Sequence, residues 1–276
     1  MIRLITDSSC TYSKEEAKKM GFFVNPLQIT MGDETFRDFE DITSEEFILK
    51  VKNGGIPHTS QPNVADLLEI FEAYPNDEFI YLSIADGLSG AYQSAMACKN
   101  MVENNERIHI VNTETLWGAQ KRMVEIALEM IKNNFKVNEI IEKIKEMATT
   151  TKSYLMPIDY DFLKRGGRLN ATAAMVASVI KLVPVVTLSP EGKSIDKFAI
   201  QRSMKKAISM VIEILKKQDI TNMKIYLSHA LSNEVDLEYA RKLLKENFPD
   251  NEICDLSLAP SMISHGGPGC IAIQVC

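Results

Sequence analysis

Short apolar runs alternate with amphipathic stretches through the first part of the chain. The apolar runs are typical of buried strands, and the stretches between them carry apolar residues at helical spacing. Strands are predicted at residues 2–5, 22–30, 79–84 and 108–112. Helices are predicted after the capping box formed by Ser13 and Glu16, and at residues 64–73, 92–103, 115–132 and 137–147. This alternation indicates a parallel sheet whose strands are joined by crossover helices.

The pattern changes after a polar stretch at residues 149–153, where we place a domain boundary. Beyond it, strands are predicted at residues 154–158, 185–188, 195–200, 224–229, 252–258 and 270–275, and helices at residues 171–181, 203–217 and 234–247. The sequence Ser-Pro-Glu-Gly at residues 189–192 predicts the turn of a hairpin. Residues 1–150 and 151–276 are therefore expected to form two α/β domains, the second with a mixed sheet.

The composition is that of a globular protein with a substantial core. Of the 276 residues, 45% are hydrophobic and 25% are charged, which excludes disordered, collagen-like and coiled-coil proteins. The start of the chain lacks the pattern of a signal peptide, and no apolar run is long enough to span a membrane, so we expect a cytoplasmic protein without an integral membrane segment. The five cysteines form no C-x-x-C pair, so we expect reduced thiols and no metal site.

Charge is distributed unevenly along the chain. The net charge of -6 is the sum of -9 over residues 1–150 and +3 over residues 151–276, and it argues against nucleic-acid binding. Within residues 164–217, however, 11 basic and 3 acidic side chains give a local charge of +8. Such a segment could face an acidic partner or a phosphate-bearing ligand, or it could be a solvated helix face.

Four polar motifs stand at the ends of predicted strands or the starts of predicted helices. They are Thr-Asp-Ser-Ser at residues 6–9, Thr-Ser-Gln-Pro at 59–62, Gly-Leu-Ser-Gly at 87–90 and His-Gly-Gly-Pro-Gly at 265–269. Ligands of open α/β sheets bind beyond the carboxyl ends of the strands, where helix N-termini favour anions. Together the motifs indicate a site for a negatively charged group. Taken singly, residues 59–62 could be a plain helix cap and residues 6–9 a strand-to-helix turn.

The motif at residues 87–91 suggests a possible enzyme. Gly-Leu-Ser-Gly-Ala nearly matches the G-x-S-x-G nucleophile elbow of hydrolases, with His265 downstream in the right chain order. A serine hydrolase of acyl esters using Ser89 and His265 is therefore one hypothesis, although no acid is singled out to orient the histidine. The alternatives are that Ser89 caps the following helix, or that its hydroxyl binds a ligand without reacting.

A basic motif, Leu-Lys-Arg-Gly-Gly-Arg at residues 163–168, could hold phosphate or dock on carboxylates. It lacks the G-x-x-x-x-G-K-[ST] pattern of nucleotide-binding loops, so a nucleotide site is not favoured. The remaining interpretations are partner docking and an exposed helix end capped by Gly166 and Gly167. A protein that serves only as an interaction or structural module is a third hypothesis for the whole chain.

These five motifs, in this order and over almost the entire chain, resemble the DegV family of bacterial lipid-binding proteins. The resemblance implies a DegV-like fold with a three-layer α/β/α first domain and a two-layer second domain, and a fatty acid held between them as ligand. It implies no cofactor and no catalysis by the protein itself. In fatty acid kinase systems, such a protein presents the acyl carboxylate to a separate ATP-dependent kinase subunit, and the acyl phosphate that forms enters phospholipid synthesis.

Carried over by position, the resemblance implies which residues do this work. The expected carboxylate contacts are Thr59, Ser89 and His265, with Ser60, Gly90 and Gly266 close by. The expected kinase-docking residues are Arg165, Arg168 and Arg202. The apolar segment at residues 173–180 is a candidate wall of the acyl-chain tunnel, and core packing is the alternative.

Overall fold

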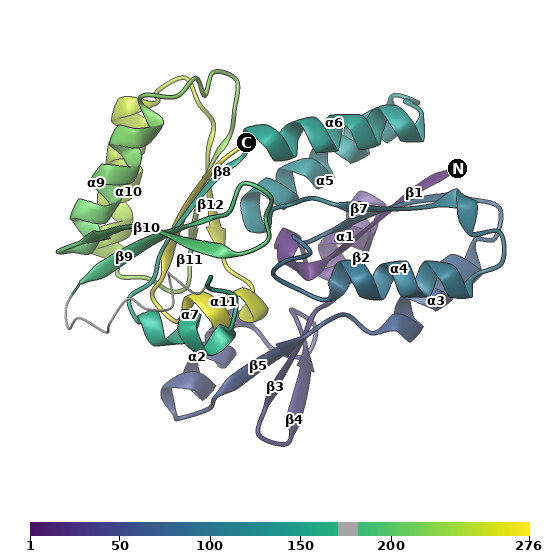
Figure 1. Cartoon of the computed structure of the whole chain (residues 1–276), viewed down its shortest axis with the longest axis horizontal. Helices are drawn as coiled ribbons and strands as arrows, with labels where there is room; N and C mark the ends of the chain where they lie inside the picture. Colours follow the sequence, from purple (N-terminus) through teal and green to yellow (C-terminus); the bar gives the residue numbers. More distant parts are fainter. Residues whose placement is uncertain (171–181) are drawn as a thin grey trace. The chain divides into compact units, whose positions relative to one another are not determined.

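The computed structural model describes residues 1–170 and 182–276 (Figure 1). The chain forms two compact units: Met1–Thr150 with Ala259–Ser261 make unit 1, and Thr151–Leu258 with Met262–Cys276 make unit 2. The predicted helix at residues 171–181, and with it the candidate tunnel wall at residues 173–180, lies outside the described residues. No helix of the described chain is both long and apolar enough to cross a membrane.

Unit 1 is built on a parallel four-stranded sheet with the order β2-β1-β6-β7. Its strands are β1 (Ile2–Asp7), β2 (Phe23–Asn25), β6 (Glu78–Ser83) and β7 (Ile108–Asn112). Helices α1 (Lys14–Met20), α5 (Trp117–Lys132) and α6 (Val137–Thr150) pack on one face, and α3 (Val64–Ala73) and α4 (Ala91–Met101) on the other. This arrangement confirms the predicted three layers.

The two faces follow from strand periodicity. Successive side chains of a strand point to opposite faces of the sheet. On β1, Leu4 belongs to the core beneath α1, α5 and α6, while its neighbour Ile5 belongs to the core beneath α3 and α4. On β6, Ile80 and Tyr81 divide in the same way. Strands that are buried on both faces have continuous apolar sequences, and these strands can therefore be predicted well from the sequence.

A second, antiparallel sheet in unit 1 corrects one prediction. It has the order β4-β3-β5, with β3 (Gln28–Met31), β4 (Glu34–Arg37) and β5 (Pro57–Ser60), and α2 (Ser44–Lys52) lies between β4 and β5 in the chain. The single strand predicted at residues 22–30 is therefore wrong: it is β2 and β3, in two different sheets. The break falls at Pro26, which has no N–H to donate to a ladder.

The helix-cap interpretation of residues 59–62 is also wrong. Thr59 and Ser60 lie on β5, where they pair with β3. Helix α3 is capped by Asn63 instead, whose side-chain oxygen accepts a hydrogen bond from the N–H of Ala65 at 2.9 Å. The polar residues of this motif therefore belong to a strand and to the turn after it, and they are not needed to satisfy a helix end.

Unit 2 has a six-stranded mixed sheet with the order β10-β9-β8-β13-β11-β12. The strands are β8 (Lys152–Met156), β9 (Val183–Leu188), β10 (Ile195–Gln201), β11 (Ile225–His229), β12 (Ile253–Ser257) and β13 (Ile271–Val275). Only β11 and β12 pair in parallel among these described strands. The predicted mixed sheet and the β9–β10 hairpin are confirmed.

Helices α9 (Met204–Leu215) and α10 (Glu234–Asn247) pack on one face of this sheet through a shared apolar core. In that core Val211 and Leu237, from the two helices, join Leu227 and Ile273, from the sheet. Two shorter helices, α7 (Tyr160–Gly166) and α11 (Pro260–Gly266), carry the basic motif and the start of the histidine motif.

Candidate functional site

The loop of residues 84–90, which joins β6 to α4, is anchored at the carboxyl ends of the parallel strands. The N–H of Ile84 donates to Asp7 Oδ2 at 2.7 Å, and the N–H of Ala85 donates to the carbonyl of Thr115 at 2.9 Å. The N–H of Asp86 donates to the side-chain oxygen of Asn112 at 3.2 Å. The motif is thus fixed by both neighbouring strands, which orients the residues that follow it.

Ser89 and Gly90 form the end of this loop. The hydroxyl oxygen of Ser89, which is half-buried, accepts a hydrogen bond from the N–H of Ala91 at 3.2 Å, at the start of α4. A Cβ atom at position 90 would collide with the side-chain oxygen of Gln61. The motif at residues 59–62 therefore lies against the motif at residues 87–90. Unit 1 brings these two predicted motifs together, and Gln61 makes the contact.

The motif at residues 6–9 is a buried scaffold. The hydroxyl of Thr6 donates to the carbonyl of Leu82 at 2.8 Å, and the hydroxyl of Ser9 donates to Asp7. Gln120 donates to Thr6 at 3.0 Å and to Asp7 at 3.3 Å, so it fastens α5 to the end of β1. Burial raises the pKa of Asp7 above its ordinary value of 3.8. These contacts favour the strand-to-helix turn for this motif over direct contact with a ligand.

A second buried carboxylate, Asp38, joins segments that are distant in the sequence. Asp38 accepts hydrogen bonds from the hydroxyl of Ser8 at 2.8 Å and from the N–H of Ser261 at 3.1 Å, and the hydroxyl of Ser261 also donates to it. Burial raises its pKa from 3.8 to about 6, although these hydrogen bonds oppose the rise. Sequence reasoning missed Asp38, Gln120 and Ser261, because no local motif marks them.

In unit 2, the basic motif and the histidine motif lie against each other. A Cβ atom at position 166 would collide with Nδ1 of His265, so the imidazole packs directly over Gly166. Nη1 of Arg168, which is half-buried, donates to the carbonyl of Gly166. Burial lowers the pKa of Arg168. Two motifs that are about 100 residues apart in the sequence thus form one cluster.

Burial and the positive charge of Arg168 lower the pKa of His265 from 6.5 to about 3. The ring is therefore neutral at pH 7, with one nitrogen carrying a proton as a hydrogen-bond donor. A general base works best with a pKa near the operating pH, so this imidazole is poorly matched to activating a serine. A neutral donor beside a cation is instead suited to holding an anion without binding it too tightly.

The glycines after His265 shape the turn that leads into β13. A Cβ atom at Gly266 would lie 2.8 Å from the sulfur of Cys270, so this position tolerates only glycine without a shift. Gly267 and Gly269 have φ values of +78° and +83°, which side-chain-bearing residues rarely adopt. Gly266 is buried, and its neighbours are Cys270 and Leu155.

The expected docking residues differ in their exposure. Arg165 and Arg202 are exposed, and the guanidinium of Arg165 lies over the ring of Phe162, 4.6 Å from its centroid. Arg168 is half-buried and turned toward Gly166. α7 ends at Gly166, and Gly167 follows with a φ of +71°, so this segment is also a glycine-capped helix end.

Comparison with known proteins agrees with the fold and the motifs. A family model described as "Uncharacterised protein, DegV family" matches residues 1–276. Protein DegV of Bacillus subtilis is 29% identical over 282 residues, which cover 100% of this chain and 99% of that protein. The DegV domain-containing protein YteA of Lactococcus lactis is 28% identical and covers 98% of this chain and 96% of its own length.

Solved structures agree as well. The crystal structure of DegV from Bacillus subtilis, described as a fatty acid binding protein, matches with a TM-score of 0.87 and 30% identity, covering 100% of this chain and 98% of that one. A DegV family protein from Thermus thermophilus, whose structure is described by its fatty acid binding, matches with a TM-score of 0.89 and 25% identity. The match covers 99% of this chain and 98% of that one. The predicted resemblance is confirmed over the full length, and the chain belongs to the DegV family.

Proposed function

We propose that this protein, in the cytoplasm, binds a long-chain fatty acid and presents its carboxylate to a separate ATP-dependent kinase without catalysing a reaction itself. The acyl phosphate that the kinase forms would feed phospholipid synthesis. The observation that carries the proposal is the likeness over the whole chain to DegV of Bacillus subtilis, a fatty acid binding protein. The two motif clusters, one in each unit, support it.

The carboxylate is proposed to contact Thr59, Ser60, Ser89, Gly90, His265 and Gly266. A carboxylate removed from water must regain hydrogen bonds, and hydroxyls with a neutral imidazole supply them. Arg168, beside His265, adds positive potential that favours an anion. Each buried methylene contributes about 0.8 kcal/mol, so a ~16-carbon chain contributes on the order of 10 kcal/mol before ordering costs. The acyl chain thus supplies most of the affinity and the carboxylate fixes its orientation.

The decisive experiment is identification of the ligand. We expect protein purified from bacterial cells to carry about one fatty acid per chain, because an acyl chain buried in apolar surroundings leaves slowly into water. Native mass spectrometry gives the occupancy, and mass spectrometry of the organic extract identifies the acid. Protein that is empty and that also takes up no fatty acid from solution would refute the proposal and favour a pure interaction module.

The serine hydrolase is not favoured, and a substitution of Ser89 distinguishes it from a protein that binds a fatty acid without catalysis. Ser89→Ala should weaken fatty acid binding by ~1 to 2 kcal/mol, through loss of a hydroxyl to the carboxylate and of the bond to Ala91. Displacement of a fluorescent fatty acid measures the change, and Ser94→Ala, in the helix α4 that follows the loop, is the control. Turnover of acyl esters by the wild-type protein, or labelling of Ser89 by a fluorophosphonate, would establish the hydrolase instead.

The kinase interaction is tested through the exposed arginines. Arg165→Glu and Arg202→Glu should leave fatty acid binding unchanged and slow acyl phosphate formation several-fold, because exposed charges at a docking surface mainly set the association rate. Raising the ionic strength from ~0.05 to ~0.3 M shortens the Debye length from roughly 14 to roughly 6 Å, and should slow the wild type more than the variants. If both folded variants form acyl phosphate at the wild-type rate, these two residues do not dock the kinase.

A further inference from the structure

A cavity of about 1160 Å³ lies beside β2 in unit 1, and its lining includes no residue of the two motif clusters. We call it the β2 groove. Residues 22–26 line it along the strand, and α1 contributes Lys14 and Lys18. One face of α3 contributes Asp66, Glu69, Ile70 and Ala73, and Tyr74 follows at the end of that helix. Among the described strands, β2 pairs only with β1, so its other side is a sheet edge with main-chain groups available for pairing.

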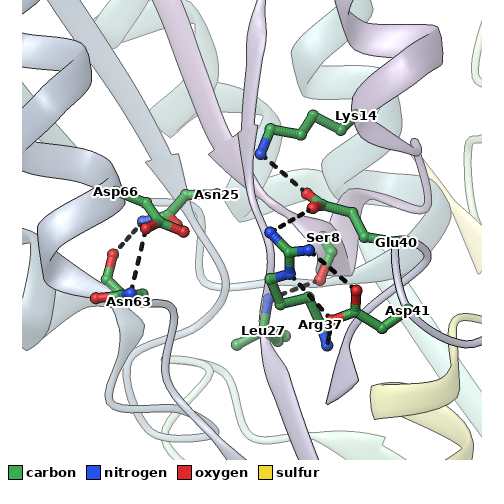
Figure 2. Close-up of polar contacts among 9 residues, drawn as sticks. All are labelled: Ser8, Lys14, Asn25, Leu27, Arg37, Glu40, Asp41, Asn63 and Asp66. Atoms are coloured by element: carbon green, nitrogen blue, oxygen red, sulfur yellow. Dashed lines mark hydrogen bonds and ion pairs between the residues drawn. The ribbon is translucent and has the colours of Figure 1, made fainter. Parts of the chain in front are cut away.

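One buried side-chain oxygen in this groove lacks a hydrogen-bond partner among the described residues. Asn25, at the end of β2, is 2% exposed, and its amide nitrogen donates to the carbonyl of Asn63 at 3.3 Å. Its side-chain oxygen has no hydrogen-bond partner within the described residues, which is a costly state for a buried acceptor. Asn63 also donates to Asp66 at 3.2 Å, and both Asn25 and Asp66 are therefore hydrogen-bonded to the same residue (Figure 2). A ligand that donates a hydrogen bond here would satisfy Asn25.

The charges that remain in the β2 groove differ between its walls: Lys18 on the α1 side forms no ion pair with any described residue, and the α3 side is acidic. Arg37 forms ion pairs with Glu40 at 3.1 Å and with Asp41 at 3.0 Å, and Lys14 pairs with Glu40 at 3.2 Å, so these cations are already neutralised (Figure 2). Asp66 and Glu69 form no ion pair with any described residue. The α3 wall therefore favours a cationic group that can also donate to Asn25.

We propose that the β2 groove binds an extended segment of a partner protein, which adds as a strand to β2 and carries lysine or arginine at alternate positions. α1 and α3 cover opposite faces of the sheet, and Val24 and Phe23 point to those two faces in turn. A strand added at this edge therefore directs every second side chain to α3, toward Asp66, Glu69 and Asn25. Pro26 limits the main-chain pairing to the three residues of β2. The side chains of α1 and α3 must therefore supply the specificity for the bound segment.

The test compares two fluorescent peptides of identical composition. Acetyl-Thr-Lys-Thr-Lys-Thr-amide places both lysines on one side of a strand, whereas acetyl-Thr-Thr-Lys-Lys-Thr-amide places them on opposite sides. Fluorescence anisotropy should show about fivefold tighter binding of the first peptide. N-methylation of its central amides should abolish binding, because a strand cannot then form its ladder. Amide exchange at Phe23 and Val24 should slow when the first peptide is bound.

Variants of α3 locate the site. Glu69→Gln should weaken binding of the alternating peptide about threefold, and Ala73→Trp, which fills the groove, should weaken it at least tenfold. Glu72→Gln, also exposed on α3 but outside the groove, should leave it unchanged. Equal binding of the two peptides, undiminished binding by the folded Ala73→Trp protein, or concentration-dependent protection of β2 by a second copy of the chain would overturn the proposal. Fatty acid occupancy should be unaffected by these variants, so the two proposals fail independently.

Discussion

Gly166→Ala is expected to reduce fatty acid affinity about tenfold or more without unfolding unit 2. The added Cβ collides with Nδ1 of His265, so the imidazole must move from its position over the end of α7. A displaced imidazole would lose the hydrogen bond that we propose it makes to the carboxylate, and hydrogen bonds to charged groups contribute about 1.5 to 3 kcal/mol. Alanine is otherwise a better helix former than glycine, so the helix itself is not weakened. Displacement of a fluorescent fatty acid measures the affinity, and thermal melting checks the fold.

Gly167→Ala is the matched control for this prediction. Gly167 has a φ of +71°, and a Cβ atom there meets nothing within 4 Å. Alanine at this position costs about 1 kcal/mol of backbone strain but does not touch the imidazole. We therefore expect Gly167→Ala to lower thermal stability slightly and to keep its fatty acid affinity. Equal affinity in both variants would show that the position of His265 does not govern carboxylate binding.

Asp38 is expected to make unit 1 less stable as the pH rises from about 4 to about 6. Its carboxyl group has a pKa of about 6 in the folded chain, raised from 3.8 by burial. Between these values the native state holds a proton that the unfolded state has released, so the free energy of unfolding falls with rising pH. A difference of about two pKa units corresponds to about 3 kcal/mol. This loss of stability is complete once the pH exceeds the pKa that Asp38 has in the folded chain.

Asp38→Asn isolates this contribution, because asparagine has nearly the same shape and does not titrate. Urea unfolding at pH 4 and at pH 7 should show that the wild type loses about 2 to 3 kcal/mol more than the variant over this range. Titrations common to both proteins cancel in the comparison. Asp33→Asn, at an exposed turn, is the control and should behave as the wild type does. Parallel pH profiles for wild type and Asp38→Asn would contradict the raised pKa.

Much of the fold follows from local pattern in the sequence. The strands β1, β6 and β7 are short apolar runs, and their helices carry an apolar stripe at helical spacing, so each element shows its own period. The break at Pro26 was also present in the sequence, in a residue that cannot donate to a ladder. The small sheet of β3, β4 and β5 is less evident in the sequence, because its strands are four residues long and partly exposed. β3 and β4 pair as a hairpin around Gly32 and Asp33, whereas β5 joins β3 only through pairing across 26 to 32 residues.

For the candidate site, the sequence by itself determined the five motifs and, through their order, the family. Only the tertiary structure decided what each motif contacts: Gln61 beside Gly90, the imidazole of His265 over Gly166, and the carboxylate of Asp38 bonded to Ser261, 223 residues away. A local pattern reports the hydrogen bonds and burial of neighbours along the chain. Burial and the nearby charge of Arg168 keep His265 neutral, and burial raises the pKa of Asp38. Both effects depend on groups brought together by folding, and no local pattern carries that information.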